Sequence, residues 1–238
     1  MPYAIAHPVA AIPAARAMGR HAVVSALVIG SVIPDAWYLV PGLERPYSHD
    51  ASGLLVFCLP AGFVAYLLFH LLLKEPLLQL LPRDLAGRAR AFACRGLPRA
   101  SWLAVLASLL VGALTHLVWD AFTHEGRLSR AFALVLTENV LRVLQHASTL
   151  LGSAYLAWWT WRRLGQATPR HAPVLALPER ILVLSALGSV FAVGFAMAWP
   201  GLEATELRRA LRVGAAGAAA GLGAALLAYS ILFRLRRR

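Results

Sequence analysis

Apolar residues form five long runs along the chain, at about 54–73, 100–120, 147–163, 180–199 and 213–233. Each run approaches the ~20 residues that an α-helix needs to cross the hydrocarbon core of a bilayer. The third run has a short apolar core, so we expect its helix to start earlier, near Thr137, and to project from the membrane. The pattern predicts an all-α, polytopic membrane helix bundle with about five transmembrane helices.

A further apolar stretch, at about 21–33, is too short to cross and is interpreted as an N-terminal re-entrant or interfacial helical segment. No basic stretch precedes an early hydrophobic run, so no cleavable signal peptide is expected. We expect residues 1–165 to carry the chemistry and 166–238 to add two scaffold helices to the same bundle. In the last run, Gly217 and Gly221 favour close helix packing, within the chain or in a dimer.

Composition and charge refine this picture. Of 238 residues, 59% are hydrophobic and 14% are charged, whereas soluble domains carry about 25% charged residues. The net charge is +12, and most of the 23 Lys and Arg residues fall in 74–99, 162–180 and 234–238. The positive-inside rule places these segments in the cytoplasm and the N-terminus outside. The charge therefore indicates topology and attraction to anionic lipids at the cytoplasmic face, and nucleic-acid binding is the weaker explanation.

The second run ends in a helical repeat of side chains that can bind metal. His116, Asp120 and His124 follow one another at intervals of four residues. Four residues advance an α-helix by about 400°, or roughly 6 Å along its axis, so the three side chains share one face. Ionisable groups at membrane depth are costly and usually mark a functional site. Imidazoles flanking a carboxylate suit zinc or a similar divalent ion, whereas the alternative is a hydrogen-bonded triad that ties helices together in lipid.

The predicted topology brings more polar residues to the same side of the membrane. His49 precedes the first run, and His146 opens the third. Asp35 follows the short apolar segment, and His7 joins the group if that segment is re-entrant. His70 lies at the other end of the first run, near a lysine, and is expected to be a hydrogen-bonded packing residue. The convergence of imidazoles and carboxylates indicates a metal site more strongly than any one motif.

One arginine stands out on the third helix. Arg142 lies one turn before His146 and one turn after Glu138, so the three share a face. A guanidinium binds phosphate oxygens bidentately, which would make Arg142 an anchor for a substrate phosphate. It could equally extend to the headgroup level without binding a substrate. Both interpretations remain open.

These motifs, in this order, resemble a bacterial membrane family catalogued as domain of unknown function 4184. The resemblance covers about residues 1–165, and Ala6 stands where a serine is expected. It implies the architecture and leaves the function open. The residues that carry it are His7-Pro8, Pro34-Asp35, Ser48-His49, Phe69-His70, His116 through Trp119-Asp120 to Thr123-His124, and Gln145-His146.

The same order of residues is similar, more distantly, to the zinc-dependent phospholipase C and P1 nuclease group and to membrane-bound metal-dependent hydrolases. Members of that group are α-helical and cleave phosphoric esters at a cluster of up to three zinc ions. Leu150 replaces an expected carboxylate and Met1 replaces a tryptophan ligand, so one or two Zn²⁺ ions, or another divalent metal, are expected here. The similarity implies seven metal ligands: His7, Asp35, His49, His116, Asp120, His124 and His146.

We therefore expect a membrane-embedded metal-dependent hydrolase at the outer face of a bacterial inner membrane. Asp35, Asp120 and Arg142 are the expected catalytic residues, the aspartates at the metal and the arginine on the substrate. The ion would lower the pKa of a bound water and polarise a phosphoryl oxygen. Because the site opens at headgroup depth, lipid-linked phosphates or phospholipid headgroups are the expected substrates. The alternatives are a metal-ion or proton transporter and a non-catalytic scaffold with a polar packing cluster.

Overall fold

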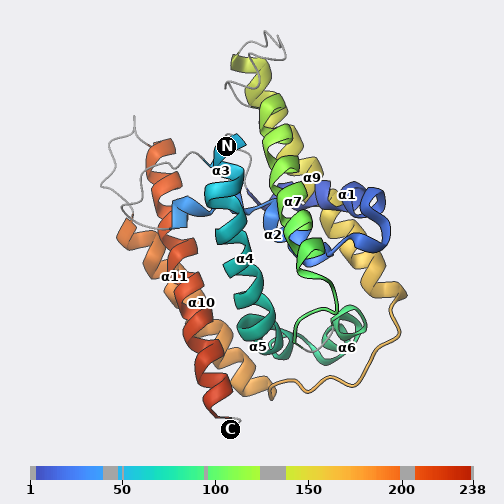
Figure 1. The fold of residues 1–238 in the computed structure, drawn as a ribbon. Helices are drawn as coiled ribbons and strands as arrows, with labels where there is room; N and C mark the ends of the chain where they lie inside the picture. The colour runs from blue at the N-terminus through green and yellow to red at the C-terminus, as the bar shows by residue number, and fades with distance from the viewer. Residues whose placement is uncertain are drawn as a thin grey trace. The chain divides into compact units, whose positions relative to one another are not determined.

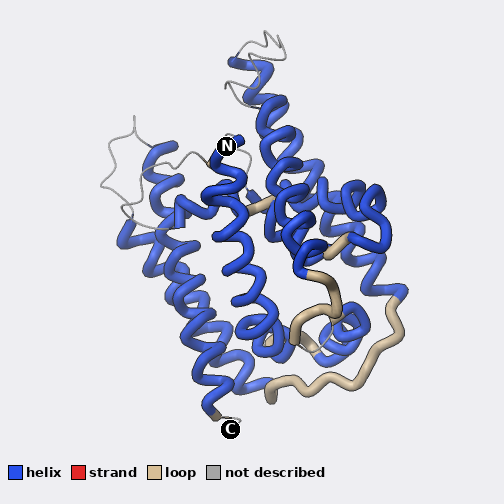
Figure 2. Tube along the Cα trace, in the orientation of Figure 1, coloured by secondary structure: helices blue, strands red, loops and turns tan. Residues whose placement is uncertain are grey.

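The computed structural model describes residues 4–39, 48–49, 51–93, 96–123, 138–198 and 207–236. Regular structure in these residues is helical, and they contain no strand (Figures 1 and 2). The chain divides into two compact units. The first consists of 1–37, 44–67 and 98–166, and the second of 38–43, 68–97 and 167–238.

Four of the described helices are long and apolar enough to cross a membrane. They are Ala51–Gln79, Trp102–Phe122, Leu177–Met197 and Val213–Leu235. These helices confirm the predicted all-α, polytopic architecture and are consistent with a multi-pass membrane protein in contact with a lipid bilayer. The consecutive parts of the first helix are α3 (Ala51–Gly53), η4 (Leu54–Cys58), α4 (Leu59–Leu68), η5 (Phe69–Leu73) and α5 (Lys74–Gln79). It begins earlier and ends later than its apolar run, which α3 and α5 extend at the two ends, and it contains two π-helical turns.

The fifth expected crossing falls within α9 (Glu138–Gln166), which starts next to the predicted position. No Asp, Glu, Lys or Arg occurs between Arg142 and Arg162. Serine, threonine and tryptophan in this interval lower its mean hydropathy, so α9 is less apolar than the four helices that are long and apolar enough to cross a membrane. The helix is therefore confirmed, and its passage across the membrane stays a prediction.

The first unit opens with a series of short helices. They are η1 (Ala4–Ala10), α1 (Ala11–Met18), η2 (Gly19–His21), α2 (Val24–Gly30) and η3 (Ile33–Leu39). With seven residues, α2 is about 10 Å long and far too short to cross a bilayer. It packs against the long helix α7 (Trp102–Thr123), as a short re-entrant or interfacial segment would.

Two glycines let α2 and α7 meet at backbone contact. A Cβ on Gly30 would overlap the carbonyl oxygen of Leu109, and one on Gly112 would overlap the carbonyl oxygen of Leu27. Small residues are the usual means of close helix approach in lipid. The crossing brings Ser31, the residue after α2, against the second half of α7, where His116 lies.

The second unit contains the end of the first long helix with α6 (Arg83–Phe92), α10 (Leu177–Ala198) and α11 (Leu207–Leu235). α10 and α11 pack together. A Cβ on Gly194 would lie 2.7 Å from the carbonyl oxygen of Gly217, so Gly217 serves packing within the chain. The extended segment after residue 166 is attached by backbone hydrogen bonds from Arg170 to Gly87 and from Leu175 to Gln79.

His70 is confirmed as a hydrogen-bonded packing residue of this unit. It is buried beside Lys74, which is also buried. The ammonium group of Lys74 donates to Nδ1 of His70 at 2.9 Å and to the carbonyl oxygen of Gly96 at 2.6 Å. These bonds join the end of the first long helix to the segment that follows α6.

Candidate metal centre

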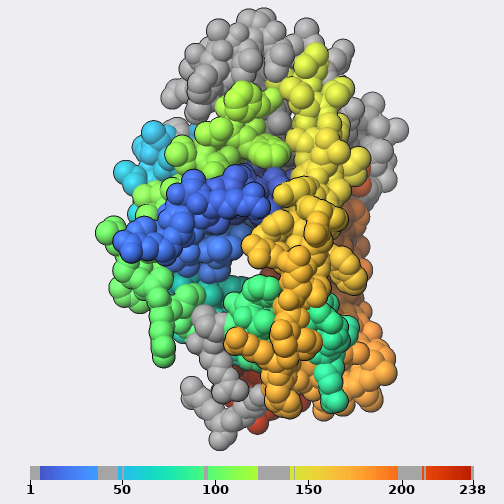
Figure 3. Space-filling model, turned by 90° about the vertical axis from the view of Figure 1, so that its right-hand side faces the viewer, coloured from blue at the N-terminus to red at the C-terminus, as the bar shows by residue number. Residues whose placement is uncertain are grey.

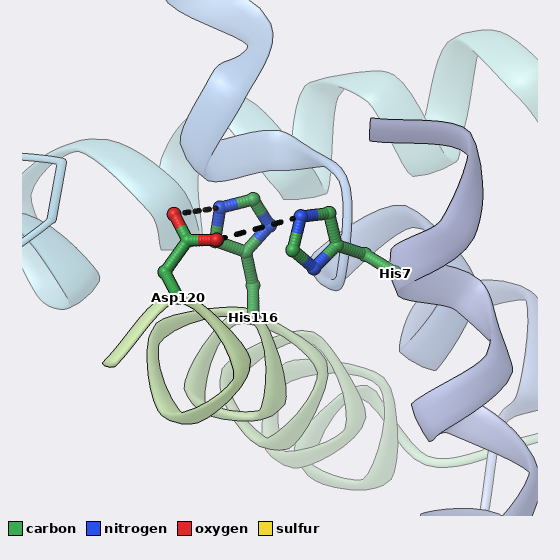
Figure 4. A group of neighbouring side chains, drawn as sticks. All are labelled: His7, His116 and Asp120. Atoms are coloured by element: carbon green, nitrogen blue, oxygen red, sulfur yellow. Dashed lines mark ion pairs between the residues drawn. The ribbon is translucent and has the colours of Figure 1, made fainter. Parts of the chain in front are cut away.

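The side chains of His116 and Asp120 form the base of the site. They lie one turn apart on α7, and Nε2 of His116 is 3.4 Å from Oδ2 of Asp120 (Figure 4). His116 is fully buried, whereas the side chain of Asp120 is 16% exposed. The imidazole therefore lies wholly inside the unit, and the carboxylate retains a small exposed fraction.

The carbonyl oxygen of Ser31 fixes the orientation of the His116 ring. It accepts a hydrogen bond from Nδ1 of His116 at 2.9 Å. A carbonyl oxygen can only accept, so in the neutral ring Nδ1 carries the proton and Nε2 carries the lone pair. A backbone carbonyl on the far nitrogen is the usual support of a metal-binding histidine.

His49 reaches the cluster from the segment that precedes the first long helix. Its Nδ1 is 2.9 Å from the hydroxyl oxygen of Ser48, which is itself buried. Its Nε2 lies 3.6 Å from Oδ2 of Asp120 and 3.5 Å from Oδ1 of Asp35. As in His116, one nitrogen is held by the protein and the other faces carboxylate oxygens.

Asp35 forms a candidate metal-binding group with His49 and His116, while Oδ2 of Asp120 faces the same two imidazoles. It lies in η3, and its Oδ1 is 3.5 Å from His49 and 3.8 Å from His116. Oδ1 of Asp35 and Nε2 of His116 are buried and form no hydrogen bond within the described part of the chain. The four nitrogen–oxygen separations, 3.4–3.8 Å, exceed the 2.7–3.2 Å of an N–H···O bond. They approach the edge, about 3.3 Å, of a tetrahedron of ligands ~2.0 Å from zinc.

His7 stacks on the ring of His116. The ring centroids are 3.9 Å apart, and Nε2 of His7 lies 3.6 Å from Oδ1 of Asp120. η1, which carries His7, packs against α9, where Ala6 contacts Gly152. Figure 3 shows the N-terminal helices beside α9. His7 is buried, and the element that carries it packs against α9.

Comparison with known proteins places the chain in a family. A family model described as "Domain of unknown function (DUF4184)" matches residues 1–231. The chain belongs to this family. The match extends beyond the expected 1–165 and takes in most of α11 as well as α10. No curated protein and no solved structure matches this DUF4184 chain, and the similarity to the zinc phospholipases stays a hypothesis.

In this DUF4184 chain, five of the seven predicted ligands come together. Within the described residues, two groups have ligand atoms within 4.8 Å of one another and could hold a metal ion. One group contains His7, His116 and Asp120, and the other contains Asp35, His49 and His116.

Of the predicted ligands whose side chains the structure describes, His146 is not brought to the cluster. His146 lies on α9 with an exposed side chain and belongs to neither group, so its role stays a prediction. His124 lies outside the described residues, as do the side chains of Arg142 and Glu138, although α9 includes their backbone. The structure therefore gives no contact for the proposed phosphate anchor.

Sequence reasoning missed the elements that orient the ligands. The carbonyl of Ser31 leaves no trace in the sequence, because any residue supplies a carbonyl. The signal that could have located it is the pair of isolated glycines, Gly30 and Gly112, within apolar stretches. An isolated glycine in such a stretch often marks close backbone approach.

Proposed function

We propose that this protein is a membrane-embedded, metal-dependent hydrolase of phosphoric esters, such as lipid-linked phosphates or phospholipid headgroups. The ion, Zn²⁺ or another divalent metal, would bind to Asp35, His49, His116 and Asp120. One observation carries the proposal. Imidazole nitrogens and carboxylate oxygens from three remote segments converge at 3.4–3.8 Å, with Nδ1 of each imidazole already engaged by the protein.

Charge also supports a cation in preference to a packing cluster. Asp35 and Asp120 are only 10% and 16% exposed, and burial of two carboxylates is costly without a compensating charge. A divalent ion would balance both of them. A cluster that served packing alone would be expected to close to ordinary hydrogen-bond lengths, and these four separations are longer.

The position of the cluster along the helices supports a lipid substrate. Asp120 lies two residues before the end of the apolar segment Trp102–Phe122, which is about 3 Å along the axis, and His116 lies about 9 Å from that end. His49 precedes the first residue of the apolar helix Ala51–Gln79. These positions correspond to the boundary between hydrocarbon and headgroups, where the phosphoric ester of a lipid lies.

The roles of the residues follow from this arrangement. A bound ion would polarise a phosphoryl oxygen and lower the pKa of a water molecule. Asp35 and Asp120 would hold the ion, while Ser31 and Ser48 keep the nitrogens of His116 and His49 turned toward it. Arg142 is the proposed anchor of the substrate phosphate, on the basis that a guanidinium binds phosphate oxygens bidentately.

We also propose that the protein resides in a bacterial inner membrane with its N-terminus and site outside and its C-terminus in the cytoplasm. The distribution of Lys and Arg supports this orientation and an interaction with anionic lipids at the inner face. Single cysteines at positions 50 and 126, in a Cys58→Ser, Cys94→Ser background, should react with an impermeant thiol reagent in intact spheroplasts. Labelling only after lysis would reverse the orientation.

The decisive experiment measures metal content and turnover in detergent-purified protein. We expect stoichiometric zinc in the wild type and in His21→Ala, which removes an exposed histidine of the same unit. Zinc and hydrolysis of bis(p-nitrophenyl) phosphate, or of phospholipid in mixed micelles, should be lost in Asp120→Asn and His116→Ala. Zinc without hydrolysis, together with uptake of zinc into vesicles, would indicate a transporter. Folded wild-type protein that binds no divalent metal would indicate a scaffold.

A further inference from the structure

Two hydrogen bonds between α2 and α7 mark the ends of one helix contact. The amide of Val23 donates to Oγ of Ser108 at 3.0 Å, and Nδ1 of His116 donates to the carbonyl oxygen of Ser31 at 2.9 Å. Each bond joins residues 85 positions apart, and the close approach at Gly112 lies midway between them on α7. The two helices therefore run in the same direction along this contact, and one register holds from end to end.

Ser108 lies at the end of this contact that is farther from the metal centre. It is fully buried, about two turns or ~12 Å before His116 along α7. We propose that Ser108 is a positioning residue of the metal centre, because its hydroxyl sets where α2 lies along α7 and so places the carbonyl oxygen of Ser31 at Nδ1 of His116. This inference rests on the proposed function and adds to it a residue outside the set of ligands.

The bond to Ser108 satisfies a backbone group that α2 itself leaves without a partner. Val23 directly precedes α2, and the first N–H groups of a helix have no acceptor within that helix. At membrane depth no water replaces a missing bond, so an unsatisfied N–H group is costly there. The hydroxyl of Ser108 accepts from Val23 inside the unit. The start of α2 is therefore held at one level of α7.

The backbone of α2 carries this position to the metal centre. The amide of Leu27 donates to the carbonyl oxygen of Val23 at 3.0 Å, and the amide of Ser31 donates to the carbonyl oxygen of Leu27 at 2.9 Å. These two helical turns join the residue held by Ser108 to the residue that orients His116. A displacement of Val23 along α7 would therefore displace the carbonyl group of Ser31 with it.

A slide of α2 by one turn shows why the register matters. One turn is about 5.4 Å, and packed elements can shift past one another by such a step. A slide toward the end of α7 would bring the carbonyl oxygen of Ser31 opposite the carboxylate of Asp120, where both groups only accept hydrogen bonds. The opposite slide would place it beside Gly112, away from His116. In the observed register, each of the two donors meets an acceptor.

Ser108→Ala tests the proposal, with Thr115→Val as the matched control. The hydroxyl of Thr115 bonds within α7, to the carbonyl oxygen of Gly112 at 2.7 Å. The affinity of the metal-stripped, detergent-solubilised chain for Zn²⁺ should fall about 10-fold in Ser108→Ala, the lower end of the loss that follows removal of a ligand's support. The affinity should stay at the wild-type value in Thr115→Val.

Nuclear magnetic resonance of the metal-free chain, labelled with ¹⁵N-histidine, separates positioning from stability. The Nδ1–H resonance of His116, identified by its loss in His116→Ala, should move in Ser108→Ala and stay in place in Thr115→Val. Val23→Pro removes the donor of the same bond and repeats the test if Ser108→Ala does not fold. Ala22 already has the extended backbone that precedes a proline, with ψ of 122°.

The outcomes separate this inference from the proposed function. A lower melting temperature in Ser108→Ala, with the His116 resonance and the zinc affinity unchanged, would make Ser108 a packing residue and overturn the proposal. Equal zinc affinities and equal hydrolysis in all variants would do the same and leave the proposed function standing. A displaced resonance in a chain whose wild type binds no divalent metal would support the orienting role of Ser108 and remove the proposed function.

Discussion

Nδ1 of His116 donates its hydrogen bond to the backbone of Ser31, 85 residues earlier in the chain, at 2.9 Å. This bond exists because α2 and α7 approach closely at Gly30 and Gly112. Gly30 directly precedes Ser31, and Gly112 lies one turn before His116 on α7. The orientation of a metal ligand thus depends on helix packing as much as on the ligand itself.

Gly112→Ala should disrupt the candidate metal centre without touching a ligand. The added Cβ would overlap the carbonyl oxygen of Leu27 and force α2 away from α7, at a cost of about 1–3 kcal/mol in the free energy of unfolding. Thermal melting should show the loss, and the affinity for Zn²⁺ should fall with it.

Gly165→Ala is the matched control for this substitution. A Cβ at Gly165, in the last turn of α9, meets no atom within 4 Å. Alanine also favours helix over glycine by up to about 1 kcal/mol. This variant should melt at the same temperature as the wild type or higher. Equal melting temperatures and zinc affinities for the two alanine variants would mean that the crossing does not position His116.

Ser48→Ala should weaken metal binding through His49. The hydroxyl of Ser48 holds Nδ1 of His49 at 2.9 Å, and loss of such a partner typically costs about 10–100-fold in metal affinity. Competition with a chromophoric chelator measures the change. Ser148→Ala removes a serine of α9 that bonds only within its own helix in the described contacts, and should leave the affinity unchanged. A similar loss in both variants would contradict the orienting role of Ser48.

Removal of the ion should lower the stability of the wild type. A ligand present at 100 times its Kd stabilises the folded state by about 2.7 kcal/mol, and the melting temperature should fall when a chelator takes the ion away. Without the ion, the carboxylates of Asp35 and Asp120 remain in a shared buried cluster.

Asp120→Asn should respond differently to the chelator. The substitution removes one of the two negative charges together with a ligand, so the chelator should shift the melting temperature of this variant much less than that of the wild type. Differential scanning fluorimetry in detergent measures both shifts. An equal shift in the two proteins would place the bound ion elsewhere.

His70→Ala should destabilise the protein and leave metal binding intact. His70 accepts a hydrogen bond from the buried ammonium group of Lys74, and loss of a buried partner costs about 1–3 kcal/mol. The melting temperature should fall while zinc stoichiometry stays at the wild-type value. Loss of zinc at an unchanged melting temperature would assign His70 to a metal site instead of to packing.

Much of the fold follows from the spacing of apolar runs. Each of the four long apolar helices covers most or all of one predicted run, because a chain in lipid must satisfy its backbone hydrogen bonds within each helix. Consecutive crossing helices run in opposite directions. The start of the first and the end of the second are therefore expected on the same side of the membrane, which is why His49 and Asp120 could be grouped. A π-helical turn leaves no signal in the hydropathy of the sequence, so the two π-helical turns of the first long helix could not be predicted.

The identity of the candidate ligands was easier to predict from sequence than the orientation of their side chains. The residues Asp35, His49, His116 and Asp120 could be grouped from sequence, since each flanks or ends an apolar stretch. Which nitrogen of each imidazole faces the cluster depends on Ser31 and Ser48 and on the crossing of α2 with α7. His146 shows the limit of the approach, because its place at the start of a run says nothing about the side of α9 on which it lies.

The ligands of the cluster are spread from residue 7 to residue 120, about half the length of the chain. During synthesis, the segments that carry His7, Asp35 and His49 are made before α7, so the cluster can form only after α7 is inserted. Capture of a cation would then come late in biogenesis and would fasten the early segments onto a helix made after them. A chain interrupted before α7 would hold most of the coordinating groups and still have no place for the ion.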